Sequence, residues 1–194
     1  LLDGDGGLIE PPFQYRDSRT DGMMEQAFAI VPKEEIYRAT GIQFMFFNTL
    51  FQLLAAQKSE PENLERAEDL LFMPDLIGYL LTGRKTQERT IASTSQLYNP
   101  RTGDWDYDLI GKFQFPKKLF KSIGEPGTVL GPLKDDVAKR TGLAAAKVVS
   151  VGGHDTASAV AGLPGGARTA AFLSSGTWSL MGMELPEPVI GSRS

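Results

Sequence analysis

The sequence contains no cysteine and only one histidine among its 194 residues. Without cysteine, the chain can form neither a disulfide framework nor a thiolate metal site. A single histidine without thiolate partners also argues against a zinc site. The absence of cysteine fits a reducing compartment, and we therefore expect a cytoplasmic protein.

Long apolar runs are missing as well. No run approaches the roughly 18 residues that a membrane-spanning helix needs, and no signal peptide opens the chain. The net charge of −4 and the isoelectric point near 5.1 give nucleic acid no basic footprint and disfavour anionic membranes. A hydrophobic fraction of 41% at this length is ordinary for one globular domain, or one and a half, with a real core.

Several well-known site motifs are also absent. The chain has no G-x-x-x-x-G-K-[ST], so a P-loop is excluded, and it has neither G-x-G-x-x-G nor G-x-S-x-G. His154 and Asp155 are adjacent, so we expect their side chains to diverge. A hydrolase triad built from His154 with Ser174 or Ser175 is therefore disfavoured.

What the chain does have is a series of helical patterns closed by turn residues. Helical spacing of apolar residues, with proline, asparagine and glycine at the ends, predicts helices over 22–30, 32–39, 48–57, 61–71, 76–81 and 137–143. Residues 84–97 are polar and β-branched, which predicts an extended segment or hairpin. Residues 104–106 are predicted to cap a short helix. The apolar run 44–47 is interpreted as core, and the lysine-rich segment 116–123 as an exposed helix face.

The stretch from residue 147 to 185 has a different pattern. A β-branched run through Val151 meets two glycines, the polar triplet His154-Asp155-Thr156 and a helix of small residues. A second apolar run stops at Ser174-Ser175-Gly176-Thr177 and then resumes. We read this as strand, polar turn, helix, strand, polar turn, strand. Because ligands of open α/β sheets bind beyond the carboxyl ends of strands, the candidate site is expected here.

Asp155 has two interpretations. It can cap the following helix by accepting hydrogen bonds from free backbone N–H groups. It can also act as a general base at a strand end, with His154 and Thr156 binding the same ligand. Gly152 and Gly153 would then let the ligand approach the backbone closely. One residue can fill both roles.

The Ser174–Thr177 turn also has two interpretations. It is either a β-turn joining two strands or a phosphate cradle in which consecutive N–H groups and hydroxyls meet an anion. Beside a carboxylate base, such a cradle would suit phosphoryl transfer to a hydroxyl, with magnesium bridging the phosphates. Near the start of the chain, Arg16, Asp17 and Arg19 form either a solvated loop or a pocket wall.

Several motifs in the right order give the chain a family resemblance. They are Gly-His-Asp-Thr-Ala-Ser-Ala-Val (153–160), Leu-Ser-Ser-Gly-Thr-Trp-Ser-Leu-Met-Gly (173–182), Tyr-Arg-Asp-Ser-Arg-Thr (15–20), Gly-Ile-Gln-Phe (41–44), Phe-Asn-Thr-Leu (47–50), Met-Pro-Asp (73–75) and Leu-Thr-Gly (81–83). Over nearly all 194 residues the chain resembles the FGGY group of sugar kinases. The resemblance implies part of an α/β, actin-like (ribonuclease H-like) ATPase fold, in which two domains close on sugar and ATP.

The resemblance also implies a role for each candidate residue. Asp155 would deprotonate a ketose hydroxyl, His154 and Thr156 would contact the sugar, and Gly176 and Thr177 would contact the phosphates of ATP. Arg16, Asp17 and Arg19 match a motif near the sugar pocket. The implied reaction transfers the γ-phosphoryl group of ATP, with Mg²⁺, to the 1-hydroxyl of L-rhamnulose.

Alternatives to this reaction remain open. The substrate can be another ketose or polyol, such as xylulose, ribulose, fuculose or glycerol, or the chain can belong to a catalytically silent sugar-binding or regulatory protein. The resemblance assigns residues 1–162 to the later part of the N-terminal domain and 163–194 to the start of the C-terminal nucleotide-binding domain. We therefore expect a fragment that is inactive alone, with no nucleic-acid or membrane partner. Its oligomeric state stays open.

Overall fold

The computed structural model describes residues 1–164, 171–176 and 179–191. Its α-helices are α1 (Met23–Ile30), α2 (Lys33–Thr40), α3 (Thr49–Ser59), α4 (Pro61–Arg66), α5 (Met73–Thr82), α6 (Arg89–Ala92), α7 (Tyr107–Lys112), α8 (Asp135–Thr141) and α9 (Asp155–Ala161), with 3₁₀ turns η1 (Ser18–Thr20) and η2 (Lys117–Leu119). Its strands are β1 (Gln87–Glu88), β2 (Tyr98–Asn99), β3 (Asp104–Trp105), β4 (Ile123–Gly124), β5 (Val129–Pro132), β6 (Lys147–Val149), β7 (Phe172–Ser175) and β8 (Ser179–Gly182). Within these residues, no helix has the length and apolarity required to cross a membrane.

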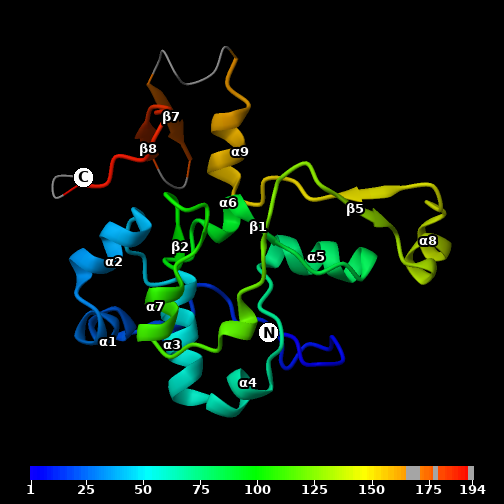
Figure 1. The fold of residues 1–194 in the computed structure, drawn as a ribbon. Helices are drawn as coiled ribbons and strands as arrows, with labels where there is room; N and C mark the ends of the chain where they lie inside the picture. Colours follow the sequence, from blue (N-terminus) through cyan, green and yellow to red (C-terminus); the bar gives the residue numbers. More distant parts are fainter. Residues whose placement is uncertain (165–170, 177–178, 192–194) are drawn as a thin grey trace.

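The hydrophobic core lies around α3 in the first two thirds of the chain. Its fully buried side chains include Ile36, Leu50, Phe51, Leu97, Leu109, Ile110, Phe113 and Leu119. Every member of the core cluster falls between Met23 and Phe120. The later segments extend away from this body, with β5 and α8 on one side and α9, β7 and β8 above it (Figure 1). The later segments therefore depend on a few specific contacts for their position.

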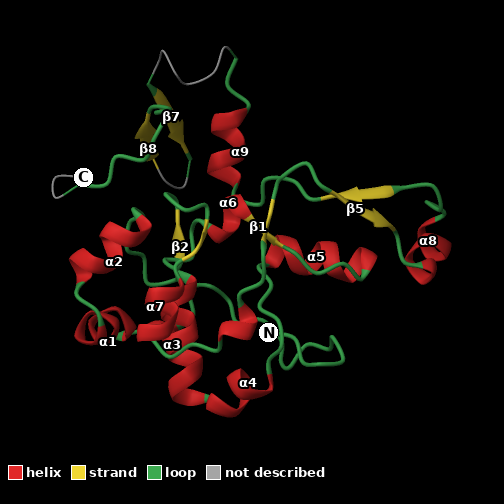
Figure 2. Cartoon of the chain, in the orientation of Figure 1, coloured by secondary structure: helices red, strands yellow, loops and turns green. Residues whose placement is uncertain are grey.

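The described strands pair two by two (Figure 2). β1 and β4 are parallel, whereas β2–β3, β5–β6 and β7–β8 are antiparallel. The order β6, polar turn, α9, β7, turn, β8 confirms the pattern expected for residues 147–185. The strand before the candidate site is nevertheless antiparallel to its partner, so in the described residues the site does not follow a parallel sheet.

Most helix predictions are confirmed, and their ends follow the expected chemistry. Gly41, Gly83 and Gly142 end α2, α5 and α8 in the left-handed conformation, with φ of 65°, 77° and 73°. This conformation costs glycine little because it has no Cβ atom. The helix predicted over 61–71 was too long, since α4 ends at Arg66. The run 44–47, interpreted as core, contains Phe46, which is 37% exposed.

The prediction for residues 84–97 was wrong over much of its length. Only Gln87 and Glu88 form a strand, and α6 begins directly after them. The helix starts there because the Glu88 side chain accepts hydrogen bonds from the N–H groups of Thr90 and Ile91. Nearby, Asp106 caps α7 as expected, while Asp104 and Trp105 form β3. The helix predicted over 116–123 is limited to the 3₁₀ turn η2, Leu119 and Phe120 are buried, and Ile123 already belongs to β4.

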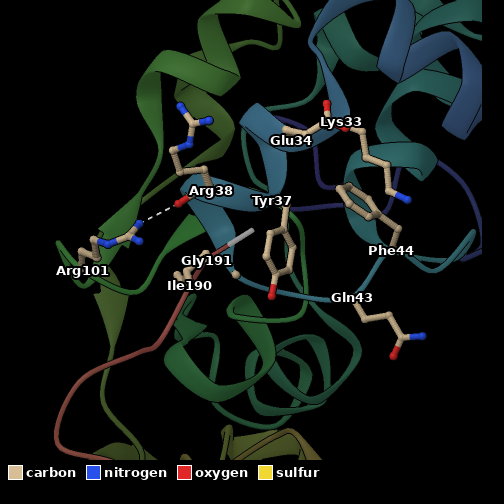
Figure 3. Close-up of a pocket in the computed structure, with 10 residues that line it drawn as sticks. Lys33, Glu34, Tyr37, Arg38, Gln43, Phe44, Arg101, Ile190 and Gly191 are labelled. Carbon is tan, nitrogen blue, oxygen red and sulfur yellow. Dashed lines mark hydrogen bonds between the residues drawn. The ribbon is translucent and has the colours of Figure 1, made fainter. Parts of the chain in front are cut away.

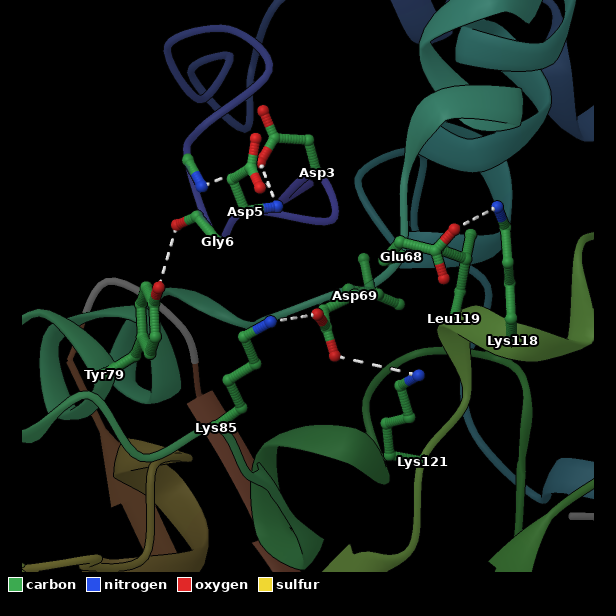
Figure 4. A network of polar contacts seen from close by, with 12 residues as sticks. Asp3, Asp5, Gly6, Glu68, Asp69, Tyr79, Lys85, Lys118, Leu119 and Lys121 are labelled. Atoms are coloured by element: carbon green, nitrogen blue, oxygen red, sulfur yellow. Dashed lines mark hydrogen bonds and ion pairs between the residues drawn. The ribbon is translucent and has the colours of Figure 1, made fainter.

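A polar network joins the start of the chain to the middle (Figure 4). Asp69, which is 6% exposed, forms an ion pair with Lys85, and Lys121 lies 3.8 Å from its other oxygen. Lys118 pairs with Glu68 at 2.8 Å, and the Tyr79 hydroxyl donates to the Gly6 carbonyl at 2.8 Å. Two lysines compensate the buried carboxylate, as a buried charge requires.

Gln87 links three segments from inside the core. Its amide Nε2 donates to the carbonyls of Leu70 and Leu119 at 2.7 and 2.8 Å, and its Oε1 accepts from the Lys121 N–H at 2.7 Å. The residue is fully buried. All three backbone groups therefore depend on this one amide.

We predict that Gln87→Leu destabilises the protein by roughly 2–4 kcal/mol, because it preserves volume but leaves two buried carbonyls and one partly buried N–H group without this partner. The free energy of unfolding in urea measures the effect. Gln57→Leu is the matched control, since Gln57 makes one long 3.4 Å bond to the Phe113 carbonyl. Equal losses in the two variants would contradict the role assigned to Gln87.

Candidate functional site

The candidate site is the turn from Ser150 to His154 and the first residues of α9. The turn lies beside α6 and the end of β1, although more than 60 residues separate them in the sequence (Figure 1). Below it, the residues of α6 and β1 belong to the well-packed body of the chain. The turn and the start of α9 are thus attached by hydrogen bonds to β1 and α6.

Glu88 provides the main attachment. The residue is 1% exposed, and its Oε1 accepts from the Thr90 N–H at 2.8 Å. Its Oε2 accepts from the Thr90 hydroxyl at 2.6 Å, the Ile91 N–H at 3.2 Å and the Gly153 N–H at 2.9 Å. One buried carboxyl group therefore both caps α6 and holds the turn before α9.

Thr90 makes a second attachment, one residue further on. Its hydroxyl donates to Glu88 and accepts from the His154 N–H at 3.1 Å. On the other side of the turn, the Ser158 hydroxyl donates to the Gly152 carbonyl at 2.8 Å. The backbone is therefore fixed at three consecutive residues before Asp155.

Gly152 and Gly153 allow the turn to pack closely against α5, α6 and α9. A Cβ atom added at Gly153 would lie 2.8 Å from Pro74 Cγ and 3.3 Å from both Glu88 Oε2 and Ile91 Cβ. A Cβ atom at Gly152 would lie 2.6 Å from the Ser158 hydroxyl. The close approach expected of a ligand at these positions is made by the protein itself, which is how the turn reaches Glu88.

Asp155 is the first residue of α9, and His154 is its N-cap residue. The Asp155 side chain is 98% exposed, and its Oδ1 accepts from the Thr156 N–H at 2.7 Å and lies 3.5 Å from the Thr156 hydroxyl. His154 Nε2 lies 3.8 Å from Asp155 Oδ1. The two side chains are therefore close together, and the expectation that they diverge was wrong. That distance is too long for a hydrogen bond, and no triad-like orientation results.

A second carboxyl group lies behind Glu88. Asp75, in the first turn of α5, is 3% exposed and accepts from the Glu88 N–H at 3.2 and 3.3 Å. Burial raises the pKa of Asp75 to about 7; the Glu88 N–H opposes the rise, and the nearby charge of Glu88 adds to it. The base of the site thus holds an acid that titrates near neutral pH.

Of the second polar stretch, 174–177, Ser174 and Ser175 are the last residues of β7, so the expected turn does not include them. Ser175 pairs with Ser179 across the two antiparallel strands, and their hydroxyl oxygens are 3.4 Å apart. Gly176 follows β7, and no described residue lies within 4 Å of a Cβ atom added there. Thr177, the other residue predicted to contact ATP, lies outside the described residues.

The Arg16–Arg19 segment is tied to its own surroundings. Asp17 accepts from the Arg19 N–H at 2.9 Å, and the Arg19 guanidinium lies 3.8 Å above the Phe13 ring. Arg19 also donates to the Gln52 carbonyl at 3.2 Å. These contacts satisfy one Asp17 oxygen and one terminal nitrogen of Arg19, whereas the Arg19 Nε is buried with no partner among the described residues.

A surface pocket of about 910 Å³ lies elsewhere in the described part of the chain. It lies between α2 and the segment at residues 190–191, and Figure 3 shows Lys33, Arg38 and Arg101 around it. None of the predicted site residues lines it. Among the described residues, no group of three or more histidine or acidic side chains is arranged to hold a metal ion.

Comparison with known proteins identifies the family. Residues 1–162 match the sequence model of the N-terminal domain of the FGGY family of carbohydrate kinases. The chain belongs to this FGGY family. A rhamnulokinase from Bacteroides thetaiotaomicron is 46% identical over 190 residues, covering 98% of the chain and 39% of the relative. One from Oceanobacillus iheyensis is 41% identical over 194 residues, covering all of the chain and 41% of the relative. The chain thus spans about two fifths of these relatives.

Solved structures of FGGY-type kinases share the fold. A carbohydrate kinase from Novosphingobium aromaticivorans superposes with a TM-score of 0.79 at 27% identity, over 98% of the chain and 40% of that structure. A structure described as a xyloylose kinase from Brucella ovis gives 0.78 at 21% identity, over 97% and 39%. The expected fold, part of the actin-like architecture of these kinases, is confirmed.

Sequence reasoning missed Glu88, Thr90 and Asp75. Glutamate is not among the preferred N-cap residues, so Glu88 gave no helix signal. The one available hint was the glycine pair at 152–153, which indicates a close approach of backbone to other atoms. It did not indicate which atoms.

We predict that, because of the raised pKa of Asp75, the free energy of unfolding decreases as the pH rises from about 5 to 7. In this range the unfolded carboxyl group, with its ordinary pKa near 3.9, is ionised while the folded group still holds its proton. Unfolding therefore releases a proton, and the free energy of unfolding falls by roughly 2 kcal/mol.

Asp75→Asn isolates this effect, because its amide cannot ionise and its oxygen can still accept from Glu88. Urea unfolding of both proteins at several pH values should show the original protein losing stability relative to the variant as pH rises. Parallel pH profiles of the two proteins would show that Asp75 does not titrate in this way.

Proposed function

We propose that this chain is part of a sugar kinase that transfers the γ-phosphoryl group of ATP to a sugar hydroxyl, with Asp155 as the general base. The observation that carries the proposal is the placement of Asp155 in an FGGY-family chain. Its carboxylate is almost fully exposed, while the backbone before it is fixed by Glu88 and Thr90. An accessible carboxylate on a fixed backbone suits proton transfer.

Asp155 would accept the proton of the attacking hydroxyl as the oxygen–phosphorus bond forms. A positioned carboxylate contributes on the order of 10²- to 10⁴-fold in rate to such a step. The Thr156 N–H orients the carboxylate through its Oδ1, which leaves Oδ2 for the proton. His154, whose ring lies on the same side as Asp155, and Thr156 would hydrogen-bond the sugar.

The turn after β7 would receive the phosphates of ATP. The Ser175 hydroxyl and the Gly176 backbone support this assignment, because no described residue lies within 4 Å of a Cβ atom at Gly176, so an anion can approach its N–H group. Thr177 is included by its place in the family motif. ATP supplies the phosphoryl group, and Mg²⁺ would be held largely through the phosphates, as in other phosphoryl transfers.

The proposed sugar is L-rhamnulose, phosphorylated at its 1-hydroxyl. The support comes from relatives above 40% identity that carry the name rhamnulokinase and align with nearly the whole chain. The xylulose and gluconate kinase structures, at 22% identity, share only the fold. We assign residues 1–162 to the N-terminal domain and 163–194 to the start of the C-terminal nucleotide-binding domain. The chain alone is therefore expected to be inactive.

We predict that Asp155→Asn in the complete kinase lowers kcat by at least about 10²-fold, because the amide cannot take up the proton. Release of ADP from Mg-ATP is measured on a panel of ketoses and polyols, and sugar binding by calorimetry. Binding should persist, since asparagine keeps the side-chain shape.

Asp135→Asn is the matched control, since Asp135 is the exposed first residue of another short helix, α8. It should keep full activity. Sugar binding without ADP release by the unaltered kinase would instead identify a silent sugar-binding protein, and strong preference for another sugar would correct the substrate.

A further inference from the structure

Glu88 makes more contacts than a helix cap requires. Capping α6 takes acceptors for the Thr90 and Ile91 N–H groups, which a short neutral side chain would supply. A buried carboxyl group is a costly alternative, because its charge leaves water. Its Oε2 is also bonded to the Thr90 hydroxyl and the Gly153 N–H. These two extra contacts are the ones that reach the site.

Thr90 extends the same attachment by one residue. A hydroxyl has one hydrogen to donate, and the 2.6 Å contact with Glu88 directs it away from the site. An oxygen lone pair is then left to accept the His154 N–H at 3.1 Å. Glu88 thereby sets the direction of the Thr90 hydroxyl, and Thr90 binds the residue directly before Asp155.

We propose that Glu88 and Thr90 are positioning residues that hold Asp155 in place for proton transfer through the N–H groups of Gly153 and His154. This proposal rests on the proposed kinase function. In the part of the chain that the structure describes, the hydrogen bonds of Glu88 and Thr90 reach the backbone before Asp155 and not its side chain, so both residues act through the backbone. A catalytic group must be held within about 0.5 Å of its productive position, and loops seldom achieve this alone.

The local geometry makes Asp155 especially dependent on these bonds. Its carboxylate is 98% exposed, so no packing around the side chain restrains it. α9 has two turns and no buried residue, so the helix itself gives little support. The orientation of its first residue therefore follows from the turn, and the turn follows from Glu88 and Thr90.

The test compares Thr90→Ala with Thr90→Ser in the complete kinase. The two variants differ by one hydroxyl group, which serine retains. Thr94→Ala is the matched control, because the Thr94 hydroxyl bonds only to the Ile91 carbonyl within the same turn. The kcat and KM values for sugar and Mg-ATP are measured well below the unfolding temperature of each variant.

Thr90→Ala should lower kcat by roughly 10- to 100-fold, as expected for a misplaced catalytic group, and leave the KM for Mg-ATP nearly unchanged. Thr90→Ser should recover most of the activity. A purely structural role would lower the unfolding temperature without this selective loss of kcat. Glu88→Gln, which leaves one acceptor oxygen in place of two, should give the same kinetic pattern and provides a second test.

Two results would overturn the proposal, and they are distinguishable. If the unaltered kinase releases ADP but Thr90→Ala keeps a kcat within about threefold of Thr94→Ala, the positioning role fails while the kinase function stands. If the unaltered kinase releases no ADP with any sugar, the proposed function fails, and the positioning role fails with it.

Discussion

The burial of Glu88 is the constraint on which the candidate site depends. Glu88 is the last residue of β1, and its side chain caps α6 and accepts the Gly153 N–H in the turn before α9. Three elements therefore share one acceptor group. Each of these elements is short, and short helices are marginal without tertiary contacts. A buried carboxyl group is best stabilised when all four of the donors around it are in place, because each missing partner is costly in a buried polar network. The three elements therefore stabilise one another through Glu88.

The same constraint explains how an exposed segment can have a defined position. The core cluster ends at Phe120, and the later segments leave most of their apolar side chains exposed, among them Val151, Leu173 and Met181. They are held instead by individual bonds. The Gly127 N–H donates to the Ser150 carbonyl at 2.6 Å, and the Ser150 N–H donates to the Thr128 carbonyl at 2.8 Å. Together with Glu88, these bonds fix both ends of the turn that leads to Asp155.

The sequence was informative where the signal is local. Helices ending at Gly41, Gly83 and Gly142 were predictable, because capping chemistry lies within a few residues of the helix end. The polar turns around Asp155 and Gly176 were found for the same reason, whereas the roles of their residues rest on a resemblance. Residues 84–97 were misread because the bonds that start α6 come from a glutamate with weak capping preference. The Glu88–Gly153 contact spans 65 residues, and no local pattern records it.

Three carboxyl groups at this site differ in burial and in hydrogen bonding, and these differences give them different properties. Asp155 is exposed, which suits exchange of a proton with a bound hydroxyl. Glu88 is buried among donors and serves as an acceptor, and Asp75 is buried behind it with its pKa raised to about 7. Below that pH Asp75 carries no charge. A proton held on Asp75 therefore avoids the cost of burying a charge on this side chain under the site.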